Sequence, residues 1–224
     1  MLHLKIKSAS PSKVKPRRLM TLGLAVISIA GIALGTFLLL PRERTPPVLQ
    51  RPSETAPSSV KPSPVAVKNY IVAPDLPRYI TIPDIGVEKA RIVRIGLTKD
   101  NQISNPNNIY DVGWYTGSSK PGLSGAMLMF GHISNWTANG VFYNLKRLKL
   151  NDKIIVERGD GKTFTFVVRA TKVYPAHKVD MQAALSPIDT NAQGLNLITC
   201  TGKIIKGTSD FSERLVVYTS LAAG

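Results

Sequence analysis

The only cysteine of the 224-residue chain, Cys200, closes an apolar run, LNLITC, that is typical of a β-strand. A free cysteine in such a run is often a small buried side chain without chemistry, and that interpretation stays open. Two features favour a reactive thiol instead. Cys200 is expected at the end of its strand, where Thr201 and Gly202 begin a loop whose backbone N–H groups can meet an oxyanion, and the Thr199 hydroxyl lies beside it.

A thiol nucleophile needs a partner that exchanges protons near neutral pH, and the imidazole of histidine is the usual one. The chain has three histidines. His3 lies in a basic N-terminal tail, and His177 lies in a predicted loop with no catalytic or ligand pattern around it. His132 directly follows the strand pattern GAMLMFG, where Gly131 permits a close approach of other groups. His132 is therefore the predicted proton partner of Cys200.

Arg214 opens the last apolar run, RLVVYTSL. A cation at a strand end is common in edge strands, so a purely structural role stays open. A guanidinium also carries five donors and a permanent charge, which suits it to stabilise the oxyanion of a tetrahedral intermediate. Because a strand that ends at Cys200 and a next strand that starts at Arg214 would run antiparallel, both residues are expected at one end of the sheet. That placement favours Arg214 over Arg94, Arg158 and Arg169.

The remaining composition argues against other kinds of site. One cysteine and scattered histidines give no zinc-ligand spacing, and no Asp-rich loop stands out for calcium, although carboxylates are spread along the chain. No cofactor is expected. The net charge of +15 divides into +9 for residues 1–74 (11 basic, 2 acidic) and +6 for residues 75–224 (18 basic, 12 acidic). Since the second part has no run of Lys and Arg with interleaved aromatics, nucleic-acid binding is not expected.

Residues 19–40 form an uncharged apolar run of 22 residues, long enough to cross a bilayer as a helix. Six basic residues and no acid precede the run within residues 1–18, which predicts a cytoplasmic N-terminus. A cleaved signal peptide is the alternative, with small residues for cleavage around Ala33–Gly35. The run continues to Leu40, beyond the ~7–15 residues usual for a signal peptide, and this favours an uncleaved, single-pass cell-membrane anchor with an extracellular domain.

The chain after the anchor divides at about residue 77. Residues 41–76 are dense in Pro, Ser and charge, and this composition predicts an extended linker. Residues 77–224 hold short apolar runs bounded by Gly, Pro, Asn and Asp. The runs predicted as strands are RYITIP, ARIVRIGL, GAMLMFGH, KIIVERG, KTFTFVVRATKVY, LNLITC and RLVVYTSL. A hairpin signal lies at Asp160–Gly161 and a single helical turn at Met181–Leu185. The expected domain is all-β: a closed or nearly closed antiparallel barrel of about eight strands with short helices.

These motifs together resemble the sortases. The resemblance runs from about Tyr79 to Leu221 and is carried by ITIPDIGVEKARI, by VGWYTGSSKPGLSGAMLMFGHIS before the histidine, by LNLITCTG and by RLVVYTSL. LNLITC is similar to the family's Thr-Leu-X-Thr-Cys signature, with Asn196 in place of the leading threonine. The phrases VGWY, LITC and VFYNL are most similar to class F, with features of classes D and E. In class F relatives the arginine often sits about two residues earlier, where this chain has Ser212.

The resemblance implies a sortase-type barrel and a catalytic triad of His132, Cys200 and Arg214. It implies that Cys200 attacks the Thr–Gly bond of a Leu-Pro-X-Thr-Gly-like signal, and that an amine of a peptidoglycan precursor, or another amine acceptor, then takes the acyl group. The implied partners are proteins with C-terminal sorting signals. Thr199 and the Thr201 N–H would support the site.

Two rival interpretations remain. An L,D-transpeptidase-like or hydrolytic cell-wall cysteine enzyme would also use cysteine and histidine outside the membrane. It would be expected to carry a Ser-His-Gly-Cys stretch, whereas Leu197-Ile198-Thr199 precedes Cys200. A non-catalytic barrel that binds an envelope polymer would leave Cys200 buried and resistant to alkylation.

Overall fold

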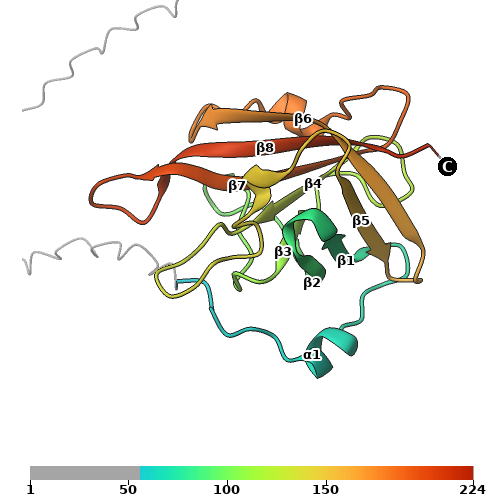
Figure 1. The fold of residues 1–224 in the computed structure, drawn as a ribbon, viewed down its shortest axis with the longest axis horizontal. Helices are drawn as coiled ribbons and strands as arrows, with labels where there is room; N and C mark the ends of the chain where they lie inside the picture. The colour runs from blue at the N-terminus through green and yellow to red at the C-terminus, as the bar shows by residue number, and fades with distance from the viewer. Residues whose placement is uncertain (1–55, 224) are drawn as a thin grey trace, which may run out of the picture. The chain divides into compact units, whose positions relative to one another are not determined.

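The computed structural model of the chain describes residues 56–223, and eight strands within them form a closed barrel (Figure 1). In barrel order the strands are β1-β2-β3-β4-β7-β8-β6-β5, and β5 pairs with β1 to close the sheet. A closed sheet has no free edge that could pair with another chain. The predicted closed all-β barrel is therefore confirmed. The strands are β1 (Pro77–Ile82), β2 (Val87–Ile95), β3 (Val112–Tyr115), β4 (Ala126–Gly131), β5 (Lys153–Arg158), β6 (Thr163–Pro175), β7 (Gly194–Ile204) and β8 (Phe211–Leu221).

The helices are short, and most connect strands. They are α1 (Pro64–Lys68), η1 (Pro83–Ile85), η2 (Leu145–Arg147) and α2 (Met181–Leu185). The turn predicted at Met181–Leu185 is confirmed as α2, whose N-cap Asp180 accepts a hydrogen bond from the Ala183 N–H. The predicted hairpin is confirmed as the β5–β6 connection, where Gly161 adopts φ +86°.

The pairing of the strands differs from the antiparallel prediction at two places. β2 pairs with β3 in parallel, and β4 pairs with β7 in parallel. Parallel neighbours need a connection of a dozen residues or more, and residues 96–111 and 132–193 supply that length. β3, with the sequence VGWY, is itself absent from the predicted strands. It is only four residues long and buried on both faces, so it lacks the alternation that identifies a strand.

Two apolar clusters lie on the two faces of the β7–β8 wall. Apolar residues from all eight strands fill the barrel interior, and they include Leu197 of β7 and Val217 of β8. The second cluster lies on the outer face, where Ile198 and Val216 pack with Ala184 of α2. Successive residues of a strand point to opposite faces, so this division shows which residues of β7 and β8 face outward.

Residues 56–76, within the predicted linker, contact the barrel. The N–H of Ser58 donates to Asn107 O (2.8 Å), and Ser58 O accepts from the N–H of Ile109 (3.0 Å). Further along, the Tyr70 hydroxyl donates to Ile92 O in β2 (2.7 Å). These bonds extend the compact unit to the N-terminal side of Pro77, the predicted start of the domain. Composition alone did not reveal them because they use backbone groups and one tyrosine hydroxyl rather than an apolar pattern.

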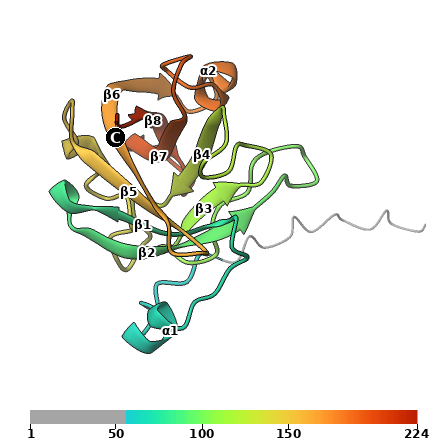
Figure 2. The same cartoon turned by 90° about the vertical axis from the view of Figure 1, so that its right-hand side faces the viewer.

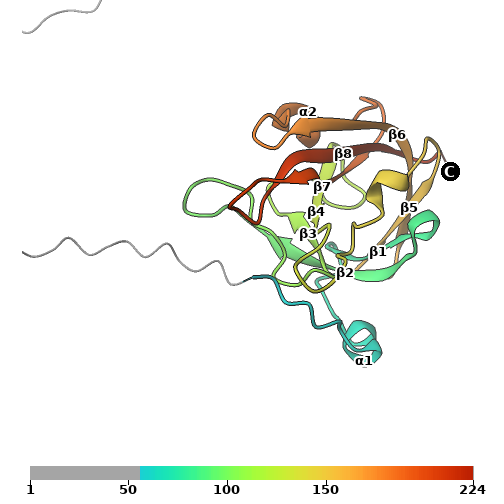
Figure 3. The same cartoon turned by 60° about the vertical axis from the view of Figure 1, so that its left-hand side comes forward.

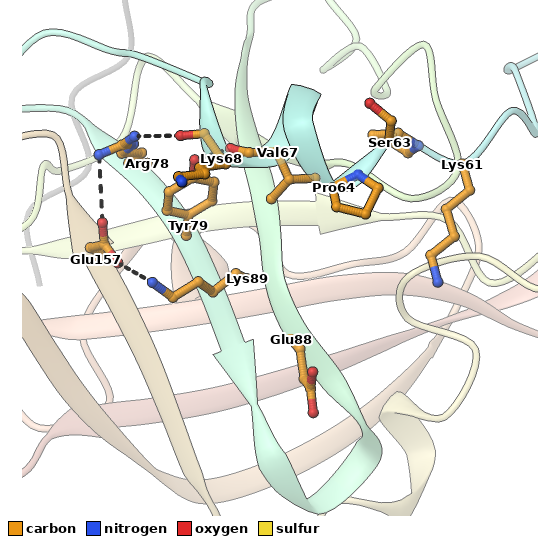
Figure 4. A pocket seen from close by; sticks show the side chains of 11 residues that line it. Lys61, Ser63, Pro64, Val67, Lys68, Arg78, Tyr79, Glu88, Lys89 and Glu157 are labelled. Carbon is orange, nitrogen blue, oxygen red and sulfur yellow. Dashed lines mark hydrogen bonds and ion pairs between the residues drawn. The ribbon is translucent and has the colours of Figure 1, made fainter.

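A hollow of about 770 Å³ lies between α1 and strands β1 and β2 (Figure 4). Its wall is charged: Arg78 and Lys89 both approach the carboxylate of Glu157, at 3.8 and 3.4 Å, and Arg78 also donates to Lys68 O. No histidine or cysteine lines the hollow. The hollow therefore lies between the N-terminal segment and the barrel, and the candidate catalytic residues lie elsewhere.

The predicted tail (1–18), the predicted anchor (19–40) and the first part of the predicted linker lie outside the described residues. Within residues 56–223, no helix has the length and apolar character that crossing a membrane requires.

Candidate active site

Cys200 and Arg214 are direct cross-strand partners on β7 and β8. Directly opposed residues of an antiparallel pair point to the same face, with Cβ atoms ~5 Å apart. Cys200 has the same strand parity as Ile198, and Arg214 the same as Val216, so both side chains lie on the outer face of the barrel wall. The strands β7 and β8 run side by side in Figure 1, and Figure 2 views them nearly end-on. The sequence prediction that the two residues share one end of the sheet is thus met by their pairing.

Both strands are longer than the sequence indicated. β7 continues from Cys200 to Ile204, and β8 begins at Phe211, three residues before Arg214. The β7–β8 register shifts between Thr201 and Ile204, and Gly202 there adopts φ +85°. A Cβ on residue 202 would also lie too close to Ser212 and Glu213. Gly202, two residues after the cysteine, therefore lies at a β-bulge within β7 and does not end the strand.

His132 lies beside the same wall because β4 runs parallel to β7. Phe130 pairs with Ile198, and the Thr199 hydroxyl, buried in the wall, donates to Gly131 O (2.8 Å). The next residue along each chain is His132 on one side and Cys200 on the other. The register therefore places His132, Cys200 and Arg214 at the same level of three neighbouring strands, and the Thr199 hydroxyl links β4 to β7 one residue before them.

The ring of His132 is oriented by a loop that the sequence did not connect with it. His132 Nε2 lies 2.8 Å from Pro106 O, in the β2–β3 connection. A carbonyl oxygen can only accept, so Nε2 carries the proton and Nδ1 is the nitrogen that can take one up. Gly140 packs so closely against the His132 backbone that a Cβ would overlap the His132 carbonyl. The histidine is thus held from two sides, which fixes its tautomer and position.

Asp210 is a further charged residue of the site, and the sequence interpretation missed it. Its Oδ1 accepts from Arg214 Nη2 at 2.7 Å. Arg214 Nη1 donates to two carbonyls of its own strand, β8: Phe211 O (2.9 Å) and Glu213 O (3.0 Å). Three of the five guanidinium N–H groups are therefore occupied. Within the described residues the Nε–H and the second Nη2–H have no protein acceptor, so they are the donors available to a bound anion.

The surroundings of Cys200 have opposing effects on its thiol. Burial raises the pKa of Cys200 above its ordinary value, the Arg214 charge lowers this pKa, and the Asp210 carboxylate raises it. Burial prevails, so the thiol stays protonated at neutral pH. A protonated thiol needs a base before it can act as a nucleophile, and the sequence analysis predicts His132 for that role.

We predict that this balance is visible in the alkylation of Cys200, because only the thiolate reacts and the chain has no other thiol. The alkylation rate should rise with pH through a midpoint above the ~8.5 of free cysteine. Arg214→Ala should move the midpoint to higher pH, and Asp210→Asn should move it to lower pH. Iodoacetamide rates followed by intact mass measure all three midpoints. A wild-type midpoint below that of free cysteine would contradict the prediction.

Asn196, the residue that replaces the signature threonine, joins β7 to α2. Its fully buried amide Nδ2 donates to Ala184 O (2.8 Å) and Ser186 O (2.9 Å). Leaving a buried acceptor unpaired destabilises a protein by about 1–3 kcal/mol, so we predict a loss of that size for Asn196→Ala. Urea unfolding measures it. Ser186→Ala is the matched control, because it keeps the backbone acceptor and removes only the exposed hydrogen bond from Ser186 Oγ to Gln182 O (2.8 Å), so it should lose much less stability.

Arg158 and Arg169 lie apart from this arrangement, whereas His177 follows Ala176, whose N–H donates to Ser212 O (2.9 Å). Arg169 donates to Ser220 Oγ (2.8 Å), and Ser220 lies six residues from Arg214 along β8, or ~20 Å. Arg158 is paired with Asp160 at the β5–β6 turn. His177 has no hydrogen bond or ion pair to a described residue. Within residues 56–223, no group of three His, Cys, Asp or Glu side chains gathers as a metal site would require.

A family model described as the sortase domain matches residues 80–222, which is 143 of the 224 residues. The chain belongs to the sortase family. Sortases are cysteine transpeptidases, and this chain is therefore an enzyme of that kind. A comparison with the curated proteins finds no match.

Solved sortase structures resemble the chain in fold. Streptococcus agalactiae sortase C1 has a TM-score of 0.51 at 23% identity, covering 69% of this chain and 72% of that one. The pilus-related sortase C of Group B Streptococcus has a TM-score of 0.50 at 22% identity, with 69% and 70% covered. Sortase A from Corynebacterium diphtheriae is 26% identical, with a TM-score of 0.49 and coverage of 68% and 63%. The first two likenesses show the sortase fold, and they give no residue its role.

Proposed function

We propose that the chain is a membrane-anchored sortase that cleaves a Leu-Pro-X-Thr-Gly-like sorting signal between threonine and glycine. The observation that carries the proposal is the direct pairing of Cys200 with Arg214, beside the strand that leads into His132. In the proposal, Cys200 is the nucleophile, His132 the proton carrier and Arg214 the cation. The class F character of VGWY, LITC and VFYNL, with features of classes D and E, is part of the proposal.

In the first step, His132 accepts the thiol proton and Cys200 Sγ bonds to the threonine carbonyl carbon. The carbonyl oxygen becomes an anion, which the two available N–H groups of Arg214 and the Thr201 N–H stabilise. When the intermediate collapses, the C–N bond breaks and His132 protonates the departing glycine amine. The product is a thioester between threonine and Cys200.

In the second step, an amine attacks the thioester and His132 takes up the amine proton. The thiolate leaves and recovers its proton, so one amide has been exchanged for another. No cofactor or external energy source is needed. The proposed acceptor is the amine of a peptidoglycan precursor, and the proposed donor is a protein with a C-terminal sorting signal.

The test uses the purified chain and a panel of Leu-Pro-X-Thr-Gly peptides. Without an amine, a productive peptide should leave an adduct on Cys200 that is visible by intact mass and released by hydroxylamine. With an added amine, the same peptide should appear joined to it. If no peptide of the panel forms an adduct or is cleaved, the proposed substrate class is wrong.

Because residues 19–40 are uncharged and follow a basic tail, we also propose that they anchor the enzyme and that its domain is extracellular. Alkaline carbonate should leave the chain in the membrane, and protease added to intact spheroplasts should digest the domain. As a matched control, a chain without residues 1–40 but with an added signal peptide should leave the membrane. Protection of the domain in intact spheroplasts would contradict this topology.

A further inference from the structure

Four apolar side chains stand exposed around the end of the barrel that carries Cys200, and we call them the apolar rim. They are Val60 (75% exposed), Trp136 (78%), Ile204 (53%) and Ile205 (39%). Single exposed apolar residues are ordinary on a protein surface. An exposed tryptophan and two consecutive exposed isoleucines are less ordinary when their loops leave the barrel at the same end, as these loops do.

The topology places the rim at one end. Trp136 lies in the loop that follows β4, and Ile204 and Ile205 lie where β7 turns into β8. Since β4 and β7 are parallel neighbours, both loops leave the barrel at the same end. In Figures 1 and 3 the β7–β8 turn and the loop after β4 extend from the same side of the barrel, and the first described residues begin beside that loop.

Val60 joins the rim through the N-terminal segment. The Thr137 hydroxyl donates to Ser59 Oγ (2.9 Å), and Asn135 Nδ2 donates to Pro57 O (3.3 Å). The segment is therefore fixed against the loop that carries Trp136, with the side chain of Val60 exposed next to it.

Lysines border the apolar rim. Lys203 and Lys206 flank the two isoleucines in the sequence KIIK, and Lys61 follows Val60; all three are exposed. Asp210, an acid of the same turn, is paired with Arg214. Tryptophan at the interface, aliphatic side chains and lysines with long apolar stems form the combination that binds an anionic bilayer surface.

The chain outside the described residues supports the same partner. In the sequence, 15 residues separate Leu40, the end of the proposed anchor, from Ala56. Even fully extended they reach only ~50 Å. If residues 19–40 cross the bilayer, as proposed, this length keeps the rim within that reach of the membrane and its local concentration there high.

We infer that the apolar rim docks on the anionic surface of the membrane that the anchor crosses, so that the catalytic end of the barrel faces the bilayer. The inference rests on the proposed anchoring of the enzyme, and not on the reaction at Cys200.

The test uses tryptophan fluorescence of the full chain in proteoliposomes whose acyl chains carry bromine, which quenches tryptophan on contact. The chain has two tryptophans, and Trp114 is buried in the barrel, so Trp136 reports on the rim. In vesicles with anionic lipid, Trp136 should be quenched and its emission should move to shorter wavelength. Trp136→Phe should remove this signal. Lys203→Ala with Lys206→Ala should lower the docking equilibrium by about fivefold for each lysine.

The matched control moves the reporter to the other end of the barrel. Leu123 is 58% exposed in the β3–β4 connection, which precedes β4, whereas the Trp136 loop follows it. The variant Trp136→Phe/Leu123→Trp should show no quenching beyond that of Trp136→Phe.

Three results would overturn the inference. Trp136 could be quenched no more than the tryptophan at position 123. It could stay unquenched in the bilayer but shift when a sorting peptide is added in detergent, which would make the rim a peptide site. The chain could also be released by alkaline carbonate, which would remove the anchor and the docking together. Retained transpeptidation in the first two cases would show that the proposed reaction stands while the docking fails.

Discussion

Replacement of Cys200 by alanine is expected to abolish transpeptidation completely. The chain contains no second thiol that could take over, and the proposed first step forms its only covalent bond to the substrate through Sγ. Cys200 is only partly buried, and the apolar cluster on this outer face, which includes Ile198, Val216 and Ala184, is formed without it. The barrel should therefore fold as before. The measurement is product formation from a sorting peptide and an amine, with circular dichroism to confirm the fold.

Cys200→Ser is the matched control for this variant. It keeps the shape of the side chain and its place opposite Arg214, but a hydroxyl is a far poorer nucleophile than a thiol when a single histidine is the base. We expect it to be as inactive as the alanine variant and to form no adduct that hydroxylamine releases. Retained transpeptidation by Cys200→Ala would show that the nucleophile has been assigned to the wrong residue.

The sequence predicts the strands of this barrel more readily than their partners. Runs such as KTFTFVVRATKVY identify β6 because alternation is a local property. The parallel pairing of β4 with β7 is set by where a connection of 62 residues returns, and no local pattern contains that information. The same pairing brings His132 to the face of Cys200. The residue types therefore suggested His132 and Cys200 as a pair, but their arrangement in space follows from the strand topology, which the local sequence does not reveal.

The hydrogen-bond partners of the site residues also could not be predicted from the local sequence. Arg214 is identified by its place in the last strand, but the acceptors of its N–H groups are Asp210, just before β8, and two carbonyls at the start of β8. An Asp four residues before an Arg is a weak signal in a turn, since such pairs are informative mainly on helices. The bond from His132 to Pro106 O was equally out of reach, because it joins two loops that are 26 residues apart.

Arg214→Ala is expected to lower kcat by ~10²–10³, the usual effect of removing one oxyanion donor. Arg214→Lys should also be slow, because an ammonium keeps the charge but cannot bond Asp210 and two carbonyls while still offering N–H groups to the substrate. The same guanidinium also binds Asp210 and the first carbonyls of β8. Its loss would therefore loosen the β7–β8 connection, which is a second way in which Arg214→Ala would slow the enzyme.

Asp210→Asn separates these two roles. The amide oxygen can still accept from Arg214 Nη2, so the turn should keep its shape while the charge of Asp210 is removed. If Arg214 acts on the oxyanion, Asp210→Asn should retain most of the wild-type kcat. Arg214→Ala should then have a much lower kcat and a KM close to that of the wild type, because the lost contact exists only in the transition state. Steady-state kinetics with peptide and amine both varied give these parameters. An Arg214→Ala enzyme with wild-type kcat and a raised KM would assign Arg214 to peptide binding instead.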